Sequence, residues 1–247
     1  MLGRIGKISY FCTENGRYVI HKHNIIEYTM RRIITTALVA LVICLPYTLQ
    51  AGVEHLLPKV QMIEDTGKEP FVLGRPVKVV YSGGAAQCPL LEEILVDNGC
   101  ALAQKGATVK IRLVKSIKGA YDYELYGYEN EAYTLKVSAD KILIEAVTNT
   151  GVIRAAQTLA QLAEGCEKGY EAIPAVKITD WPAFKLRGYM HDTGRSYIPV
   201  DELIKQIELL SRFKVNTFHW HLTENQAWRF EVKAYPELTS VTSMTRH

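Results

Sequence analysis

The densest group of residues that could carry chemistry is the segment His219–Arg229, which combines histidine, tryptophan, glutamate and arginine. Side chains alternate across a β-strand, so His219 and His221 share one face while Trp220 lies on the other. Two imidazoles at the carboxyl end of a parallel strand can bind a metal ion or hydrogen-bond a polar substrate. Glu224 follows where parallel α/β folds place ligand groups. The segment predicts a polar binding site, with core-packed imidazoles as the alternative.

A second group surrounds an earlier predicted strand, which Arg187 opens and near whose end Asp192 and Arg195 lie. An arginine in the mouth of a barrel can donate two parallel hydrogen bonds to hydroxyl groups or to a carboxylate. Strand parity places Arg187 and Asp192 on opposite faces of the strand, so their side chains need not meet. Arg187 is therefore a candidate ligand clamp, and a structural Arg–Asp pair is the equal alternative.

The elements that must position these residues follow Pro182. The sequence predicts a strand over 187–193, a helix over 199–213 with apolar residues at helical spacing, and a strand over 215–222. Strand, helix and strand within about 35 residues make one βαβ unit, which implies parallel pairing and a right-handed crossover.

The preceding residues, from about 55 to 180, predict a separate unit. Alternation indicates strands near 60–62, 77–81, 109–113 and 176–178, and a hairpin formed by 133–137 and 142–144. Helices are expected over 89–104, with Gly99 weakening the second half, and over 152–163. The order of strands and helices is typical of a small α+β layer domain.

The segments Arg187–Arg195 and Asn216–Arg229 resemble the opening of the catalytic barrel of glycoside hydrolase family 20, the β-N-acetylhexosaminidases. The upstream unit resembles that family's small α+β domain, notably over Gly151–Leu159. The resemblance implies an α+β small domain over 55–180, followed over 181–247 by the first βα units of an incomplete (β/α)8 TIM barrel. The family commonly has Ser-Arg-His at 194–196 and Asp-Asp-Gln at 224–226, where this chain differs.

The function implied by this resemblance is a retaining, substrate-assisted hydrolysis that needs no cofactor and removes terminal N-acetylhexosamine from glycans. Arg187 is expected to hold sugar hydroxyls, and Glu224 to support the active site. His219 and His221 are weaker candidates for binding the substrate. The expected partners are glycans that contain N-acetylhexosamine.

No catalytic residue is assigned, because the family's Asp-Glu pair follows a His-x-Gly-Gly run that this sequence lacks. Asp201 and Glu202 lie in the first turn of the predicted helix, where acids favour the positive helix end. A complete barrel takes about 250 residues, far more than follow Arg187. We therefore expect an inactive piece with unpaired strand edges and an exposed apolar helix face, hence poor solubility or association.

The first 51 residues contain a predicted targeting signal. Met30-Arg31-Arg32, an apolar run and the small residue Ala51 make a signal peptide over 30–51, which implies a secreted or periplasmic protein with no stable membrane span after cleavage. Residues 1–29 are interpreted as an extension ahead of the true start. The formal net charge of +3 is concentrated in this region, so the remainder is nearly balanced and no nucleic-acid partner is expected.

Two other function classes stay open. A metal-dependent amidohydrolase-type barrel fragment would also use His-x-His at a strand end, but it leaves the Arg187 stretch unexplained. A non-catalytic glycan-binding module would place the function in the α+β unit alone. The three cysteines that follow residue 51 match no zinc spacing and are interpreted as buried structural residues.

Overall fold

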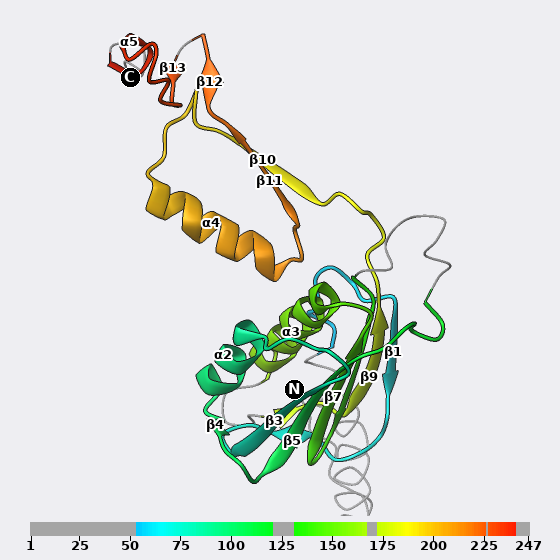
Figure 1. Cartoon of the computed structure of the whole chain (residues 1–247). Coiled ribbons are helices and arrows are strands. Elements are labelled where there is room, and N and C mark those ends of the chain that lie inside the picture. The colour runs from blue at the N-terminus through cyan, green and yellow to red at the C-terminus, as the bar shows by residue number, and fades with distance from the viewer. Residues whose placement is uncertain (1–52, 121–130, 167–171, 226, 241–247) are drawn as a thin grey trace, which may run out of the picture. The chain divides into compact units, whose positions relative to one another are not determined.

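The computed structural model describes residues 53–120, 131–166, 172–225 and 227–240 (Figure 1). The predicted extension over 1–29 and the predicted signal peptide over 30–51 lie outside these residues. None of the helices within the described ranges combines the length and the apolar character that a membrane crossing requires.

The α+β unit is built on a seven-stranded sheet with the order β1-β9-β6-β7-β5-β3-β4. Strands β3, β5 and β7 pair in parallel, whereas β7, β6, β9 and β1 pair antiparallel. A separate antiparallel pair joins β2 and β8. The bounds are β1 Met62–Asp65, β2 Phe71–Val72, β3 Pro76–Ser82, β4 Ala101–Leu102, β5 Ala107–Leu113, β6 Tyr133–Ser138, β7 Lys141–Ala146, β8 Ala172–Ile173 and β9 Val176–Asp180.

The predicted hairpin is confirmed. Strands β6 and β7 pair antiparallel, and Ser138 is aligned with Lys141, so that two residues form the connecting turn. Alternation also holds in β5, where Val109 and Ile111 are buried and Lys110 between them is half-buried. The period of two therefore placed the core-facing side chains of these strands correctly.

Helices α2 (Pro89–Asp97) and α3 (Asn149–Glu164) lie next to one another along the sheet (Figure 1). Thr148 caps α3, because its hydroxyl accepts a hydrogen bond from the backbone N–H of Gly151. A Cβ atom at Gly151 would lie 2.8 Å from the carbonyl oxygen of Ala132. Glycine at this position therefore lets α3 pack closely against the residues that precede β6.

Helix α2 is shorter than the sequence predicts, because it ends at Asp97 rather than near residue 104. Gly99 has a φ of +77°, and the backbone N–H of Cys100 donates to the carbonyl of Leu95. This left-handed cap satisfies the last carbonyls of the helix and redirects the chain into β4.

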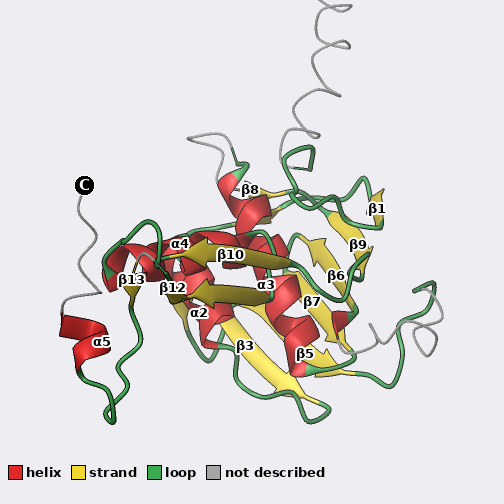
Figure 2. Ribbon diagram, turned by 90° about the horizontal axis from the view of Figure 1, so that it is seen from above, coloured by secondary structure: helices red, strands yellow, loops and turns green. Residues whose placement is uncertain are grey.

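Beyond Pro182 the predicted βαβ unit is confirmed. Strand β10 (Gly188–Asp192) pairs in parallel with β11 (Thr217–His221), and α4 (Val200–Arg212) connects them. Figure 2 shows the arrows of both strands pointing the same way. A short hairpin of β12 (Thr223–Glu224) and β13 (Ala227–Trp228) follows, and α5 covers Glu237–Ser240.

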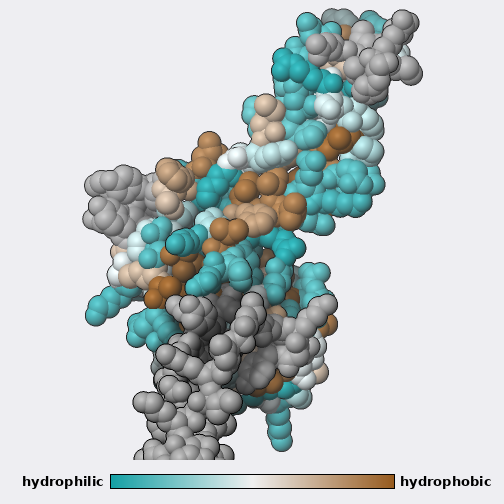
Figure 3. Space-filling model, turned by 180° about the vertical axis from the view of Figure 1, so that it is seen from behind, coloured by the Kyte–Doolittle hydropathy of each residue, from teal (hydrophilic) through white to brown (hydrophobic). Residues whose placement is uncertain are grey.

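The apolar stripe of α4 is largely uncovered. Leu203 is the buried residue of this helix, whereas Ile204 and Ile207 are 49% and 42% exposed. Met190 and Trp220 on the two strands are also exposed, and Figure 3 shows apolar side chains gathered at the surface beside hydrophilic ones. Within the described residues, the predicted exposure of the helix face is thus present.

Among the cysteines of the described residues, Cys88 and Cys100 are buried free thiols and Cys166 is half-buried. Burial raises the pKa of the Cys88 thiol, which keeps this thiol protonated and unreactive at neutral pH. Their structural interpretation is consistent with these positions.

Candidate functional site

Three half-buried polar side chains meet at the carboxyl ends of β10 and β11. Asp192 and His221 are aligned partners at the last register position of the two strands. The Nδ1 of His221 lies 3.3 Å from the Oδ2 of Asp192, and its Nε2 lies 3.8 Å from the Oε2 of Glu224. Each ring nitrogen therefore faces one carboxylate.

Arg195 completes this group from the loop that follows β10. Its Nη2 lies 3.0 Å from the Oε2 of Glu224, and its Nη1 lies 3.4 Å from the Oδ2 of Asp192. The backbone N–H of Arg195 also donates to Asp192 and lowers the pKa of that carboxyl, and the His221 ring and the Arg195 guanidinium act in the same direction. Asp192 is therefore ionised at neutral pH. We call Asp192, Arg195, His221 and Glu224 the carboxyl-edge cluster.

Gly194 allows the cluster to form. A Cβ atom at this residue would lie 3.0 Å from the Cβ of Glu224 and 3.1 Å from the Oδ1 of Asp192. These distances are tighter than ordinary van der Waals contacts, so any other residue would press the two carboxylates away from their positions.

Thr193 fixes the loop to the end of β11. Its buried backbone N–H donates to the carbonyl of His221 at 3.0 Å. The Nε1 of Trp220 donates to its hydroxyl, and the Nε of Arg229 donates to its carbonyl, both at 3.0 Å. Trp228 is half-buried and donates from its Nε1 to the carbonyl of Phe230. The carboxyl-edge cluster thus rests on ordered hydrogen bonds.

His219 does not belong to the cluster. It is aligned with Met190 in the middle of the strands and is exposed. In the described part of the chain, the group that could hold a metal ion is Asp192, His221 and Glu224, whose donor atoms lie within 4.8 Å of one another. The two imidazoles of the His-x-His run therefore do not form a shared ligand set, which is what the amidohydrolase alternative requires.

Arg187 lies at the opposite end of the strands from Glu224. It precedes β10, and five residues of extended chain span roughly 16 Å. Its Nη2 forms an ion pair with the Oε2 of Glu131, and its Nε and Nη1 donate to the carbonyls of Lys214 and Phe184, both at 2.7 Å. Arg187 therefore lies outside the group at the carboxyl ends of the strands, and its expected role in holding sugar hydroxyls stays a prediction.

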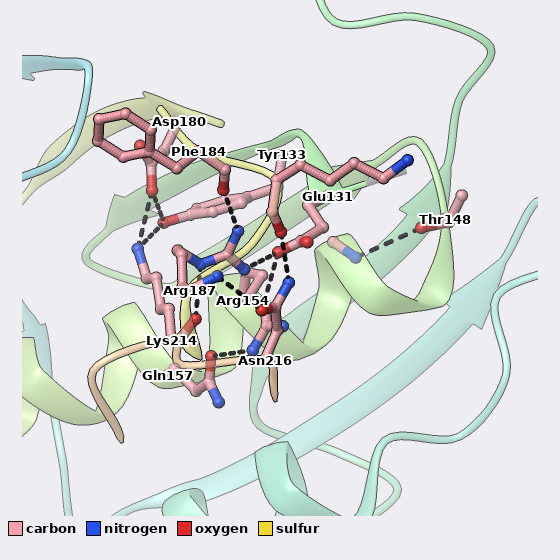
Figure 4. Close-up of polar contacts among 12 residues, drawn as sticks. Glu131, Tyr133, Thr148, Arg154, Gln157, Asp180, Phe184, Arg187, Lys214 and Asn216 are labelled. Atoms are coloured by element: carbon pink, nitrogen blue, oxygen red, sulfur yellow. Dashed lines mark hydrogen bonds and ion pairs between the residues drawn. The ribbon is translucent and has the colours of Figure 1, made fainter. Parts of the chain in front are cut away.

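The residues around Arg187 form a buried ionic network that links the α+β unit to the βαβ unit (Figure 4). Glu131 also accepts a hydrogen bond from the Nε of Arg154 at 2.8 Å. The Nζ of Lys214 lies 2.8 Å from the Oδ2 of Asp180 and 3.0 Å from the hydroxyl oxygen of Tyr133. We call these residues the junction network: Glu131, Tyr133, Arg154, Asp180, Arg187 and Lys214.

Burial shifts the pKa of two residues of the junction network, Tyr133 and Lys214. It raises the pKa of Tyr133 well above its ordinary value, and the neighbouring Asp180 carboxylate acts in the same direction. Burial lowers the pKa of Lys214, while Asp180 opposes that shift. A cavity of about 180 Å³ is lined by these residues together with Trp181 and Phe184. Because each of its buried ions has a charged partner, the network is suited to holding structure together.

Two features of the site escaped the sequence analysis. Arg195 was named only as a neighbour of Asp192, although its position after the strand places it at the ligand edge. The junction network gave no signal, because Tyr133 and Lys214 are 81 positions apart in the sequence. Strand direction could have identified Arg195, whereas only the folded structure could bring the junction residues together.

Two models of one protein family match the chain. The model of glycosyl hydrolase family 20, domain 2, matches residues 54–181, and the model of the glycosyl hydrolase family 20 catalytic domain matches residues 184–247. The first match alone covers more than half of the 247 residues.

Individual relatives agree with these matches. A β-hexosaminidase of Porphyromonas gingivalis is 40% identical over 121 residues, which are 47% of this chain and 16% of that protein. A β-N-acetylhexosaminidase of Cellulomonas fimi is 31% identical over 172 residues, which are 70% of this chain and 29% of that protein.

Solved structures show the same relationship. The family 20 exo-β-N-acetylglucosaminidase of Vibrio harveyi, in complex with N-acetylglucosamine, superposes with a TM-score of 0.62 at 30% identity, covering 77% of this chain and 29% of that one. The chitobiase of Flavobacterium johnsoniae gives a TM-score of 0.60 at 28% identity, covering 80% and 31%. The chain thus spans only a minor part of the relatives it matches. On these matches, the chain belongs to glycosyl hydrolase family 20.

Proposed function

We propose that this chain carries the α+β domain and the first barrel unit of an exported β-N-acetylhexosaminidase, which removes terminal N-acetylhexosamine from glycans. The carboxyl-edge cluster is the observation that carries the proposal. It sets a charged donor, Arg195, beside a carboxylate acceptor, Glu224, at the strand ends where parallel barrels bind their ligands. Membership of glycosyl hydrolase family 20 supports the reaction class.

In this proposal, the guanidinium of Arg195 donates hydrogen bonds to sugar hydroxyls. Glu224 holds the guanidinium in place and accepts from a neighbouring hydroxyl. A planar guanidinium offers two parallel donors, which suits a pair of adjacent hydroxyls on a sugar ring. Arg187, the residue first expected in this role, pairs with Glu131 at the amino ends of the strands, and its own contact with the sugar stays a prediction.

The reaction proposed for the whole enzyme is retaining and substrate-assisted. The oxygen of the sugar's own 2-acetamido group attacks the anomeric carbon while a general acid protonates the departing glycosidic oxygen. Water then opens the resulting ring and restores the acetamide. The described residues would bind the sugar and would supply neither the acid nor the carboxylate that orients the acetamide.

The chain of 247 residues is therefore proposed to lack turnover. The adjacent acids Asp201 and Glu202 are exposed in the first turn of α4, and Glu202 forms an ion pair with Lys205 at 2.7 Å. Neither residue reaches the carboxyl-edge cluster through any contact recorded among the described residues. We propose further that β10, α4 and β11 open a (β/α)8 barrel, and that residues 30–51 direct the protein to the periplasm or the exterior.

Binding of N-acetylglucosamine to the purified chain tests the sugar-binding part of this proposal. Ligand-observed NMR should detect weak binding to the wild-type chain, and Arg195→Gln and Glu224→Gln should each abolish it. His219→Ala is the matched control, because His219 lies on the same strand outside the cluster, and binding should persist. Equal binding by the Arg195→Gln variant would contradict the proposal.

A further inference from the structure

The carboxyl-edge cluster offers metal ligands that sugar recognition does not require. Asp192, His221 and Glu224 come from the end of β10, the end of β11 and the following strand β12. Each contributes one donor atom, and these atoms lie within 4.8 Å of one another. All three side chains are half-buried, so they are accessible to an ion from solvent.

The spacing fits one kind of coordination. The bonds from zinc to nitrogen and carboxylate oxygen are about 2.0–2.1 Å long, so neighbouring donors of a tetrahedral site lie about 3.4 Å apart. The Nδ1 of His221 and the Oδ2 of Asp192 are 3.3 Å apart. Glu224 lies on the other side of the ring and would need a rotation of its own side chain to join them. Three protein ligands leave the fourth position open to water.

The charge balance favours a divalent ion. Two carboxylates and one guanidinium leave one negative charge uncompensated when His221 is neutral. The Arg195 side chain is the most exposed member of the cluster, with 60% of its surface accessible. A long and exposed side chain can swing into solvent, and a divalent ion in its place would neutralise both carboxylates.

The ligand chemistry selects the ion. One imidazole nitrogen with two carboxylate oxygens suits zinc and its transition-metal neighbours, whereas calcium and magnesium prefer oxygen ligands alone. We propose that the carboxyl-edge cluster is a zinc-binding site, in which Zn²⁺ held by Asp192, His221 and Glu224 displaces the Arg195 guanidinium. Zinc would thereby exclude the sugar. That competition rests on the proposed function, but zinc binding itself does not.

Isothermal titration calorimetry of the 247-residue chain with ZnCl2 tests the site. Because other histidines and thiols of the chain can also take up zinc, the measured quantity is the difference between variants. The wild type should bind one more zinc equivalent than His221→Ala and Glu224→Gln, while the control His219→Ala should match the wild type. Equal zinc stoichiometry in the wild type and the His221→Ala variant would overturn the proposal.

Arg195→Ala provides the opposite test, because it removes the competing cation while leaving every ligand in place. Zinc affinity at this site should rise about tenfold, the effect of removing one positive charge a few ångströms away at a partly exposed position. Unchanged or weaker zinc binding in this variant would contradict displacement of the guanidinium.

Adding N-acetylglucosamine separates the two proposals. Weaker zinc binding in its presence supports both the shared site and the proposed function. Zinc binding that depends on His221 but ignores the sugar keeps the zinc site and overturns the competition. Sugar binding that depends on Arg195, together with no zinc binding that depends on His221, overturns the zinc site alone.

Discussion

Lys214 and Asp180 form a buried ion pair, with 2.8 Å between the Nζ and Oδ2 atoms. Asp180 is the last residue of β9, and Lys214 lies between α4 and β11. Lys214 has a φ of +61°, and the residue after it, Val215, donates from its backbone N–H to the carbonyl of Leu210. Lysine therefore occupies the left-handed position after the helix that usually holds glycine. Its ion pair ties the start of β11 to the end of β9.

The first prediction concerns that ion pair. Lys214→Met should lower the free energy of unfolding by about 3–5 kcal/mol, because it leaves the Asp180 carboxylate buried without a cation. Urea denaturation monitored by circular dichroism measures the change. The double variant Lys214→Met with Asp180→Leu should recover part of the loss, and a strictly additive loss would show that the two side chains do not interact.

Lys214→Gly distinguishes the side chain from the backbone. Glycine relieves the left-handed strain by about 1 kcal/mol but also removes the amine. We expect Lys214→Gly to be less stable than the wild type. A Lys214→Gly variant that is more stable than the wild type would mean that backbone strain outweighs the ion pair.

The second prediction compares a buried carboxylate with an exposed one. Glu131→Gln should destabilise the chain by about 3–5 kcal/mol, because Arg154 and Arg187 share this buried carboxylate. Glu164→Gln is the control, since Glu164 pairs with Arg212 while half of each side chain stays exposed; it should cost about 1 kcal/mol or less. Similar losses in the two variants, read from urea midpoints, would rule out the proposed role of the junction network.

The sequence predicted the elements on either side of this network but could not predict the network. Period-two and helical spacing report which face of an element is apolar, so β5, the β6–β7 hairpin and α4 were found from local patterns. A contact between Tyr133 and Lys214 depends on how two units pack together, and no local pattern encodes that. Gly99 is an intermediate case. The sequence indicated that this glycine weakens the second half of the predicted helix, and in the structure α2 ends just before it, at Asp97.

The third prediction is a pH dependence caused by Tyr133. Its pKa is raised in the folded state, so above about pH 10 the unfolded chain loses a proton that the folded chain keeps. Stability should therefore fall as pH rises, by up to about 1.4 kcal/mol per pH unit. The contribution of Lys214 to this pH dependence has the opposite sign. Because its pKa is lowered in the folded state, stability rises with pH until the pKa of lysine in the unfolded chain is reached.

Tyr133→Phe isolates the tyrosine, since both proteins retain Lys214. Urea unfolding from pH 9 to pH 11 should give a less steep decline of stability in Tyr133→Phe than in the wild type. Parallel stability curves for the two proteins would contradict the assignment to Tyr133.

The fourth prediction concerns Gly106, which precedes β5 and has a φ of +139°. A Cβ atom there would lie 2.2 Å from the carbonyl oxygen of Pro76, so Gly106→Ala must separate β5 from β3. We expect a loss of about 3 kcal/mol or more. At Gly67, with a φ of +61° and open space around the Cβ position, alanine should cost only about 1 kcal/mol. Thermal unfolding of both variants tests the difference, and equal melting temperatures would refute it.

The candidate site was predicted in part. Glu224 was identified because it follows a predicted strand and His221 because it lies at the carboxyl end of that strand, and the structure brings these two residues together. Arg187 was named as the candidate ligand clamp and Arg195 only as a neighbour of Asp192, whereas in the structure Arg187 precedes β10 and Arg195 follows it. His219 shares the face of His221 but lies two positions earlier, too far from the strand end to join the cluster.

The most direct test of the central claim is hydrolysis of an aryl β-N-acetylglucosaminide by the purified 247-residue chain. Because this chain is proposed to hold sugar-binding groups and no general acid, release of the chromophore should not exceed the rate in buffer. Robust turnover that is lost in an Asp201→Asn/Glu202→Gln double variant, or in any other variant of this chain's own carboxylates, would contradict the account.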